Sequence, residues 1–208
     1  MEVQNGYDEW SGSYDSDENL TRDLDRLMIR SRLGGLQFDS ILEAGCGTGK
    51  NTSFLAQIGG SVRAVDFSEG MIAIAREKIQ AENVRFSLMD ITQPWVFEAA
   101  SFDLITSSLV LEHIQDLNHV FREAARTLRP GGRLFIDELH PFRQYDGGKA
   151  GFYREEQRIE IDSFIHHISD FYRAGMEHDL SLIQLDEYWH QADRAGPPRL
   201  LSLMFERC

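Results

Sequence analysis

The chain has few of the residues that build cross-linked or metal-bound proteins. Its 208 residues include only two cysteines, Cys46 and Cys208, too few for a disulfide framework or a thiolate metal site. Proline is also scarce, at five residues, and no apolar run reaches the length of a membrane span. The first residues lack the basic segment and apolar core of a secretory signal, so we expect a cytoplasmic protein without a membrane partner.

Positive charge is in short supply as well. The chain has 21 lysine and arginine residues against 34 aspartate and glutamate residues, a formal net charge of -13. A field of that sign repels phosphate backbones, which makes nucleic acid an unfavourable partner. The remaining composition, with 42% apolar residues, suits one globular domain. We expect a small molecule as its partner, and a monomer or a homodimer.

Strand and helix patterns alternate over the middle of the chain. Short apolar runs predict strands at residues 40–45, 61–66, 83–90, 101–108 and 133–139. Amphipathic spacing predicts helices at residues 50–58, 69–81 and 116–128. This alternation is typical of a parallel sheet with helices on both faces. Two later strand patterns suggest an antiparallel pair at one sheet edge, at residues 181–189 and 199–207.

Three glycines alternate with other residues in ILEAGCGTGK, residues 41–50, between a predicted strand and a predicted helix. Gly45, Gly47 and Gly49 would let the backbone turn tightly and bring peptide groups within hydrogen-bond reach of a ligand. Cys46 is expected to be a small buried residue within this loop. The strand–loop–helix context favours a cofactor site over a turn without a ligand.

Two other kinds of glycine-rich loop fit this spacing less well. A phosphate-binding Walker loop needs a glycine where Ala44 stands and a hydroxyl where Asn51 stands. A nicotinamide-binding fingerprint needs its third glycine where Lys50 stands. Both departures from these phosphate-binding patterns favour a ligand without phosphate. A nicotinamide-dependent oxidoreductase remains an alternative.

The loop from Glu43 to Gly49, Glu-x-Gly-x-Gly-x-Gly, resembles the nucleoside-methionine loop of class I S-adenosylmethionine-dependent methyltransferases. VDFSEGM and MDIT resemble the places where that family holds the ribose and the adenine. FDLITSSLVLEHI and LRPGGRLFI resemble its fourth and fifth strands. The resemblance covers residues 38–140 and the final strand pair. It is greatest for the small-molecule branch related to ubiquinone and menaquinone biosynthesis methyltransferases.

The resemblance implies S-adenosyl-L-methionine as the cofactor and S-adenosyl-L-homocysteine as the product. Asp66 would accept hydrogen bonds from both ribose hydroxyls, and Phe67 and Met71 would pack around the adenine. Asp90 would accept from the adenine amino group, and the backbone amide of Ile91 would meet a ring nitrogen. The full set of predicted cofactor-binding residues is Tyr14, Glu43, Gly45, Cys46, Gly47, Gly49, Asp66, Phe67, Met71, Asp90, Ile91 and Ser107.

The resemblance also implies an α/β fold, a three-layer Rossmann-like sandwich around a mostly parallel seven-stranded sheet with an antiparallel C-terminal strand pair. We expect one methyltransferase domain over residues 1–208. Its expected segments are an N-terminal helical lid at 1–35, a cofactor-binding core at 36–140, a substrate-cap insertion at 141–178 and the strand pair at 179–208. Within the lid, a helix is predicted to begin after Asn19 or Thr21. The insertion is expected to cover a site because unusually long connections often do.

Methyl transfer is an in-line displacement, so alignment of the acceptor and exclusion of water matter most. A base helps when the acceptor is an alcohol or a protonated amine, and histidine titrates in a suitable range. His140 is the first candidate because it follows the fifth strand at the carboxyl edge of the sheet, although it could simply bond a loop carbonyl. His166 and Tyr145 are further candidates, and His113 is expected to be structural. No metal site is expected.

Aromatic residues in the N-terminal segment and in the connection after residue 140 could form a lid over a sulfonium, or they could equally form a satellite core. These residues are Trp10, Tyr14, Tyr145, Phe152 and Tyr153. The same connection carries cations in an otherwise acidic protein, which suggests a carboxylate-bearing acceptor or, more simply, a solvated face. The cations are Arg143, Lys149, Arg154 and Arg158.

The patterns together predict a methyltransferase that moves a methyl group from S-adenosylmethionine to oxygen, nitrogen or carbon of a small molecule. Two alternatives use the same cofactor site. One is methylation of a protein or a tRNA, and the other is an S-adenosylmethionine-binding protein without catalysis.

Overall fold

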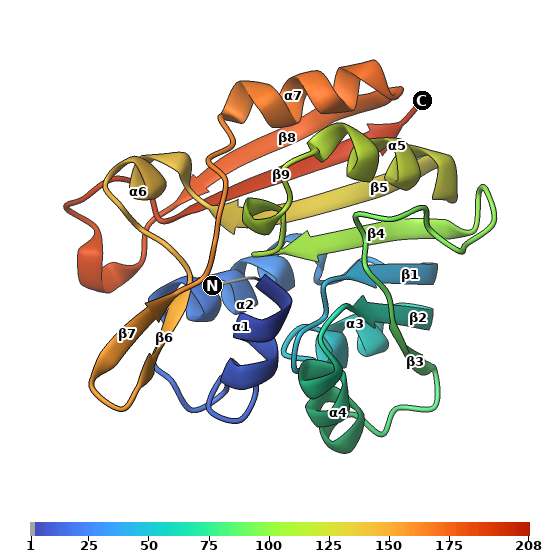
Figure 1. The fold of residues 1–208 in the computed structure, drawn as a ribbon. Coiled ribbons are helices and arrows are strands. Elements are labelled where there is room, and N and C mark those ends of the chain that lie inside the picture. Colours follow the sequence, from blue (N-terminus) through green and yellow to red (C-terminus); the bar gives the residue numbers. More distant parts are fainter. Residues whose placement is uncertain (1–2) are drawn as a thin grey trace.

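One mixed sheet organises residues 3–208, the part of the chain that this computed structural model describes (Figure 1). In chain order its strands are β1 (Phe38–Ala44), β2 (Gly59–Asp66), β3 (Val84–Leu88), β4 (Phe102–Ser108), β5 (Leu128–Leu139), β8 (Leu180–Tyr188) and β9 (Leu200–Arg207). They lie in the order β3-β2-β1-β4-β5-β9-β8. The pairs among β1 to β5 are parallel, whereas β9 runs antiparallel to both β5 and β8. The predicted sheet is therefore confirmed, including its antiparallel C-terminal pair.

Helices cover both faces of the sheet, as the alternating pattern predicts. They are α1 (Val3–Trp10), α2 (Leu20–Leu33), α3 (Thr52–Ile58), α4 (Glu69–Lys78), α5 (Leu117–Thr127), α6 (Pro141–Tyr145), α7 (Ile168–Glu177) and the short 3₁₀ helices η1 (Leu111–His113) and η2 (Gln191–Asp193). One face carries α2, α3 and α4, which bury Leu33, Leu55 and Ile72 in one core. The other face carries α5 and α7, which bury Phe121 and Phe171. Across residues 3–208, no helix combines the length and apolar character needed to cross a membrane.

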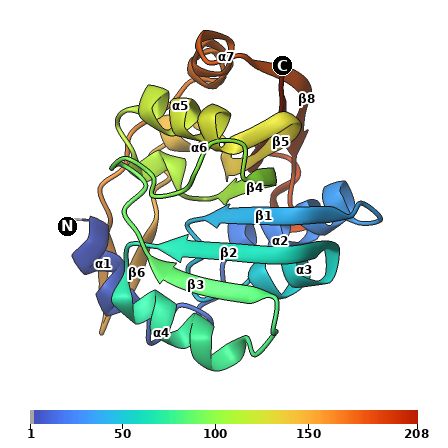
Figure 2. The same cartoon turned by 90° about the vertical axis from the view of Figure 1, so that its right-hand side faces the viewer.

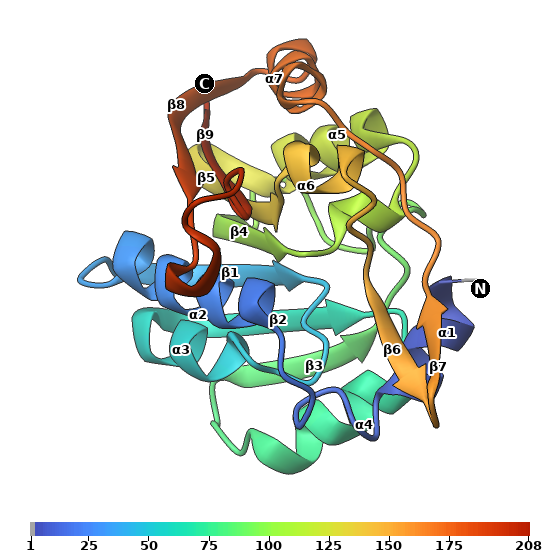
Figure 3. The ribbon, with the colours of Figure 1, turned by 90° about the vertical axis from the view of Figure 1, so that its left-hand side faces the viewer.

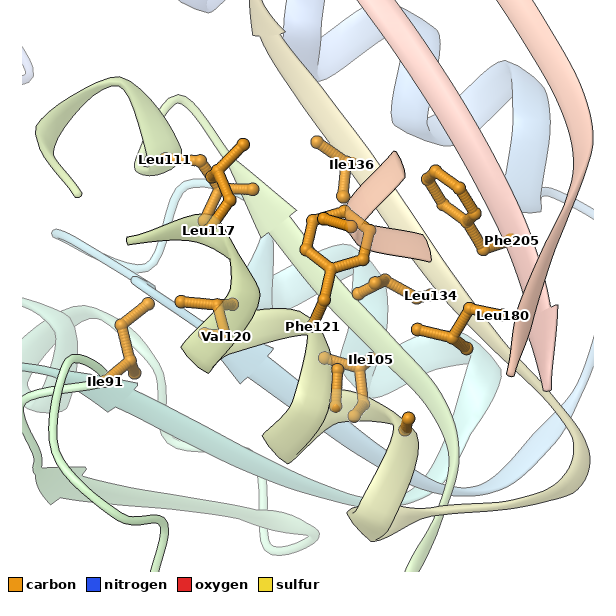
Figure 4. Close-up of a cluster of buried hydrophobic side chains, with 14 of the residues drawn as sticks. Ile91, Ile105, Leu111, Leu117, Val120, Phe121, Leu134, Ile136, Leu180 and Phe205 are labelled. Carbon is orange, nitrogen blue, oxygen red and sulfur yellow. The ribbon is translucent and has the colours of Figure 1, made fainter. Parts of the chain in front are cut away.

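Successive residues of β5 fill the two cores in turn. Leu134 and Ile136 belong to the core under α5, and Phe135 between them belongs to the opposite core. In the first core Phe121 meets Phe205 edge to face, with ring centroids 5.3 Å apart (Figure 4). Each such fully buried side chain stabilises the fold by about 1.5–3 kcal/mol. The central strands are therefore held rigidly, and the residues at their carboxyl ends inherit fixed positions.

The long connection after β5 carries secondary structure of its own. It forms α6 and then a hairpin of β6 (Gly151–Arg154) and β7 (Gln157–Glu160). Glu155 in the two-residue loop has a φ of 55°, a conformation for which hairpin turns favour glycine or asparagine. The loop sequence carries neither residue, so the pattern does not predict the hairpin.

The hairpin and α1 lie together beyond the carboxyl ends of β1, β2 and β3, toward which the arrowheads point in Figures 2 and 3. Trp10 stacks on Phe152, with ring centroids 5.6 Å apart. Glu9 of α1 also forms an ion pair with Arg154 of β6. These contacts place an aromatic cover over the sheet edge where parallel α/β folds bind ligands.

Candidate functional site

The glycine loop follows β1 at that carboxyl edge. The backbone N–H groups of Gly45 and Cys46 both donate to the carbonyl of Val65 on β2, at 2.8 and 2.9 Å. Gly45 has a φ of 85°, and a Cβ there would lie 2.2 Å from a methyl carbon of Val110. Gly47 has a φ of 52° and faces open space, because a Cβ there would meet no heavy atom within 4 Å. The loop therefore presents bare backbone to the region beside it.

A cavity of about 300 Å³, here called the loop cavity, opens beside Gly47. It lies among the carboxyl ends of the first four strands, with α1 on its outer side. It brings together eight of the predicted cofactor-binding residues, namely Tyr14, Gly45, Gly47, Asp66, Phe67, Met71, Asp90 and Ile91. A site for a nucleoside requires a concave surface that combines carboxylates, exposed backbone and apolar side chains, and the loop cavity has all three.

Asp66 is the last residue of β2 and a central polar group of the loop cavity. Its two carboxylate oxygens accept hydrogen bonds from the backbone N–H of Gly47 at 2.8 Å and of Ser68 at 3.0 Å. Burial raises the pKa of Asp66, an effect that these backbone hydrogen bonds oppose. Each oxygen has a second lone pair, so the carboxylate can still accept from two hydroxyl groups.

Asp90 and Ile91 line the cavity after β3. The Oδ1 atom of Asp90 accepts from the backbone N–H and the hydroxyl of Thr92, at 2.9 and 2.7 Å. Ile91 is buried, and Phe67 on the neighbouring wall meets Tyr7 of α1 edge-on, with ring centroids 6.3 Å apart. Between these two walls lies a narrow part of the loop cavity. The carboxylate of Asp90 lies at its edge, and its sides are apolar.

A smaller polar hollow of about 50 Å³ adjoins the loop cavity and shares Gly45 and Gly47 with it. Tyr14, Glu43 and Cys46 line it, as predicted residues of the cofactor site. Within residues 3–208, the buried polar atoms along this hollow that lack a hydrogen-bond partner are Nε of Arg22, Oδ1 of Asp25, Oδ1 of Asn51, Oγ1 of Thr106 and Oγ of Ser108. Buried polar atoms are rarely left unpaired, so this mixture of donors and acceptors fits a ligand that carries both charges.

Glu43 is a fully buried acid at the base of this hollow. Its Oε2 atom accepts a hydrogen bond from the hydroxyl of Thr52 at 2.6 Å. Burial raises the pKa of Glu43 to about 8, so the side chain holds its proton at neutral pH. A neutral Glu43 adds no negative charge to the hollow.

We expect Glu43→Gln to remove part of the pH dependence of stability. The folded protein keeps the Glu43 proton up to a pH of about 8, whereas the unfolded chain releases it above its ordinary pKa of 4.5. The folded state binds more protons between these values, so stability falls as the pH rises through that window. Glutamine does not titrate and keeps the shape of the protonated acid, so the variant should lose less stability there. Urea unfolding at a series of pH values measures the slope, and an unchanged slope would contradict the expectation.

His140 does not line the loop cavity. Its imidazole is completely buried, binds the carboxylate of Glu187 at 2.8 Å, and caps α6 by accepting from the backbone N–H of Phe142 at 3.2 Å. The position at the end of the fifth strand is as expected, but the chain turns into α6 there and carries the ring away from the cavity. These contacts favour a structural role over the catalytic one predicted from the sequence.

His166 and Tyr145 also lie off the loop cavity. His166 binds the backbone carbonyl of Ile114 at 2.8 Å through Nε2. Tyr145 is half exposed on α6, where its hydroxyl meets the imidazole of His167. The structure therefore does not bring the three predicted catalytic residues together with the predicted cofactor site.

Two predicted cofactor-binding residues point away from both hollows. Ser107 is buried, but Thr106 and Ser108 line the polar hollow, and successive residues of a strand face opposite sides. Gly49 packs against α4, since a Cβ there would lie 3.4 Å from the Cβ of Ala75. Strand register thus decides which serine faces the polar hollow.

Tyr7 and His113 form a polar pair on the loop cavity that no sequence pattern predicts. Nδ1 of His113 lies 2.7 Å from the carbonyl oxygen of Asp162, which can only accept, so Nδ1 carries the proton. Nε2 therefore accepts from the Tyr7 hydroxyl, 2.9 Å away. Burial raises the pKa of Tyr7 well above its ordinary value, so the hydroxyl stays protonated. No local motif joins residues 106 positions apart, which is why the pair could not be predicted.

Glu138 fixes the position of His113. It lies near the end of β5, and its Oε1 atom accepts from the backbone N–H groups of Val110 and Leu111, at 3.0 and 2.8 Å. These N–H groups stand at the start of η1, where a helix has unpaired donors. The carboxyl group thus ties η1 to the rigid sheet and holds His113 at the cavity.

A third cavity of about 380 Å³ adjoins the other two. Tyr14 and Leu109 line all three. Leu109 has a φ of 57°, a strained conformation for leucine, and its N–H donates to the carbonyl of Asp137 at 2.7 Å. Such strain is often found at functional sites. We call this space the basic cavity, after its cations Arg22, Arg143, Lys149, Arg158 and Arg199.

Comparisons with known proteins identify the family. A family model described as "Methyltransferase domain" matches residues 42–136. A demethylmenaquinone methyltransferase of Tropheryma whipplei (strain Twist) is 32% identical over 178 residues, which cover 85% of this chain and 68% of that protein. The chain belongs to the S-adenosylmethionine-dependent methyltransferases. The resemblance stated from the glycine loop and the strand ends is confirmed.

Solved structures agree with the fold of this methyltransferase. An S-adenosylmethionine-dependent methyltransferase from Mesorhizobium loti has a TM-score of 0.73 at 20% identity, covering 87% of this chain and 96% of that one. Geranyl diphosphate C-methyltransferase from Streptomyces coelicolor A3(2), solved with Mg²⁺, geranyl diphosphate and S-adenosyl-L-homocysteine, has a TM-score of 0.66 at 18% identity. That match covers 89% of this chain and 77% of the other. At these identities the likeness concerns the fold.

The cofactor of this methyltransferase is S-adenosylmethionine, and the residues at the site fit it. Bare backbone at Gly47 and the free lone pairs of Asp66 suit a nucleoside. The unpaired donors and acceptors of the polar hollow suit the zwitterionic amino acid end. Among residues 3–208, no group of three or more His, Cys, Asp or Glu side chains is placed to hold a metal ion.

Proposed function

We propose that this methyltransferase transfers a methyl group from S-adenosylmethionine to an oxygen, nitrogen or carbon atom of a small-molecule acceptor. One observation carries the proposal: the loop cavity and the basic cavity meet at Tyr14 and Leu109, so that cofactor and acceptor can lie in contact. The basic cavity has the volume of a small-molecule site. Relatives named for demethylmenaquinone and geranyl diphosphate support the same class of acceptor.

The cofactor would lie across the loop cavity and the polar hollow. Asp66 would hold the ribose hydroxyls, and Asp90 with the Ile91 backbone would hold the adenine edge. Phe67 and Met71 would pack against the adenine ring. In this arrangement each of these residues would have the role that the family resemblance implies for it.

The amino acid end of the cofactor would occupy the polar hollow. Arg22 has an unpaired buried Nε atom that can donate to a carboxylate, and Asp25 has an unpaired Oδ1 atom that can accept from an ammonium group. Both lie on α2, whose N-terminus is fixed by hydrogen bonds to the side chain of Asn19 at 3.0 Å. The helix thus supplies both a donor and an acceptor from one element.

When bound, S-adenosylmethionine supplies a methyl group on a positively charged sulfur, which leaves as a neutral thioether. The chain aligns the acceptor with this group and excludes water by means of the aromatic cover of Trp10 and Phe152. A hydroxyl or ammonium acceptor must also lose a proton. Tyr7 would accept that proton on its oxygen while passing its own to Nε2 of His113, whose lone pair already receives the Tyr7 hydroxyl.

We expect Tyr7→Phe to lower the rate of methyl transfer by about 100-fold, the range typical of a lost proton-transfer group. Phenylalanine keeps the ring, so the affinity for S-adenosyl-L-homocysteine should change less than about threefold. The control is Tyr145→Phe, which removes another hydroxyl bound to a histidine but lies outside the loop cavity. Labelled methyl transfer into the extract fraction that the wild-type protein methylates gives the rates. An equal effect of both variants, or none from Tyr7→Phe, would contradict the relay.

Isothermal titration with S-adenosylmethionine and S-adenosyl-L-homocysteine tests the proposed function directly. Binding of both, followed by transfer of label to a low-mass component of a cell extract, is the expected result. Absence of heat with either compound would refute cofactor binding. Label recovered only in protein or RNA would instead support a macromolecular acceptor.

A further inference from the structure

The basic cavity carries a charge opposite to that of the chain as a whole. Five cationic side chains line it against the carboxyl groups of Glu18 and Glu112, whereas in the full sequence acidic residues outnumber basic ones by 34 to 21. Burial raises the pKa of Glu112, which weakens its negative charge further. A concave site with this bias concentrates anions at its surface.

The cations are only partly neutralised by nearby carboxylates. Arg143 and Arg199 share one carboxylate, that of Asp193, which lies 2.9 Å from Arg143. Lys149 pairs with Glu160 at 3.4 Å, but both side chains are about half exposed, and such pairs contribute little. Because two guanidinium groups share one carboxylate, a net positive charge remains in the cavity.

Arg22 lies at the boundary between the basic cavity and the polar hollow. It is only 4% exposed, and its guanidinium donates to the backbone carbonyls of Tyr14 and Asp17 while resting 4.0 Å from the Tyr14 ring centroid. Among residues 3–208 no carboxylate forms an ion pair with it. A buried guanidinium without a counter-ion is costly. In the proposed cofactor site the carboxylate of S-adenosylmethionine supplies that negative charge, so an acceptor anion would be held by the other four cations of the basic cavity.

Apolar and aromatic side chains form much of the remaining wall of the basic cavity, beside the polar residues Asn19 and Thr21. Trp10 and Tyr7 come from α1, and Leu20, Leu109 and Leu139 complete the surface. A ligand that fits both the cationic and the apolar parts of the basic cavity has an anionic end and a flat or apolar body. The volume of about 380 Å³ suits a single small molecule rather than a polymer.

We propose that the basic cavity binds the methyl acceptor through an oxyanion, a carboxylate or a phosphate, attached to a small aromatic or apolar body. The proposal rests on the proposed function, because it treats this cavity as the acceptor site beside the cofactor. It narrows the acceptor from any small metabolite to an anionic one.

Binding of simple probes to protein saturated with S-adenosyl-L-homocysteine tests this proposal. Saturation fills the place of the cofactor's own carboxylate, so a further anion reports on the basic cavity. We expect benzoate or phenyl phosphate to bind by isothermal titration, more weakly as sodium chloride is added, and the neutral analogue benzamide to show no binding. Equal binding of benzamide, or no binding of either anion, would overturn the proposal.

A pair of variants on the hairpin locates the binding site. Arg158→Gln removes a cation of the cavity and should weaken anion binding about tenfold, as expected for one charged hydrogen bond. Arg154→Gln is the matched control, because Arg154 lies on the same hairpin but pairs with Glu9 outside the cavity. It should change anion binding less than about twofold. Equal effects of the two variants, or no effect of Arg158→Gln, would overturn the assignment.

The same titrations separate the two proposals. Both variants should bind S-adenosyl-L-homocysteine as the wild-type protein does, since neither residue lines the loop cavity. If the wild-type protein binds S-adenosyl-L-homocysteine but neither anion, only the anionic acceptor is refuted. If it does not bind S-adenosyl-L-homocysteine, the proposed function fails and this inference fails with it.

Discussion

Gly47→Leu should abolish cofactor binding while leaving the protein folded. A Cβ at Gly47 would meet no heavy atom within 4 Å, so the position has room for a side chain to begin where the loop borders the loop cavity. The leucine side chain would occupy the space in which the backbone at residue 47 must approach the nucleoside part of the cofactor. We expect the affinity for S-adenosyl-L-homocysteine to fall at least about 100-fold, or about 2.7 kcal/mol.

Gly131→Leu is the control for the backbone strain in that experiment. Gly131 has a φ of 76° and also faces open space, but it lies in β5 outside the loop cavity. Both variants place leucine in the left-handed region, which costs about 1–2 kcal/mol of stability. Thermal unfolding should therefore show similar losses for the two proteins, and only Gly47→Leu should lose binding in a titration. Retained binding by Gly47→Leu would mean that the cofactor does not cross this loop.

The central part of the fold could be predicted because each element carries its own local signal. Asn19 caps α2 through hydrogen bonds to two backbone N–H groups, as a side chain of its type favours. The alternation of β1, α3, β2 and α4 is visible from hydrophobic spacing alone. The positions of Asp66 and Asp90 follow from the strands, since a parallel sheet brings its carboxyl ends to one edge.

Other features depend on register and on distant contacts, which no local pattern records. Ser108 lines the polar hollow and Ser107 does not, a distinction of one residue in strand register. Tyr7 reaches His113 only because α1 folds back over the sheet edge. The fold directs His140 toward Glu187 although its place after the fifth strand suggested the active site. Sequence patterns therefore predicted the residues that line the loop cavity better than the contacts made by Tyr7 and His140.

Asp66→Ala should be the most damaging single substitution of a side chain at the cofactor site. The carboxylate holds the backbone N–H groups of Gly47 and Ser68, and we propose that it also holds the ribose. Each N–H group left without a partner costs about 1–3 kcal/mol of stability. Loss of hydrogen bonds from two hydroxyls to a charged acceptor should weaken cofactor binding about 100-fold or more.

Asp103→Ala is the control that separates the effect of Asp66→Ala on stability from its effect on cofactor binding. Asp103 also accepts a backbone N–H from a neighbouring strand, that of Ser40 at 2.9 Å, and it pairs with Arg129 at 2.7 Å, but it does not line the loop cavity. Its removal should lower stability and leave the affinity for S-adenosyl-L-homocysteine unchanged. Urea unfolding and isothermal titration of both variants provide the comparison. If Asp66→Ala lost only as much binding as Asp103→Ala, the carboxylate at the end of β2 would serve the loop alone, and the ribose would have to be held by other groups.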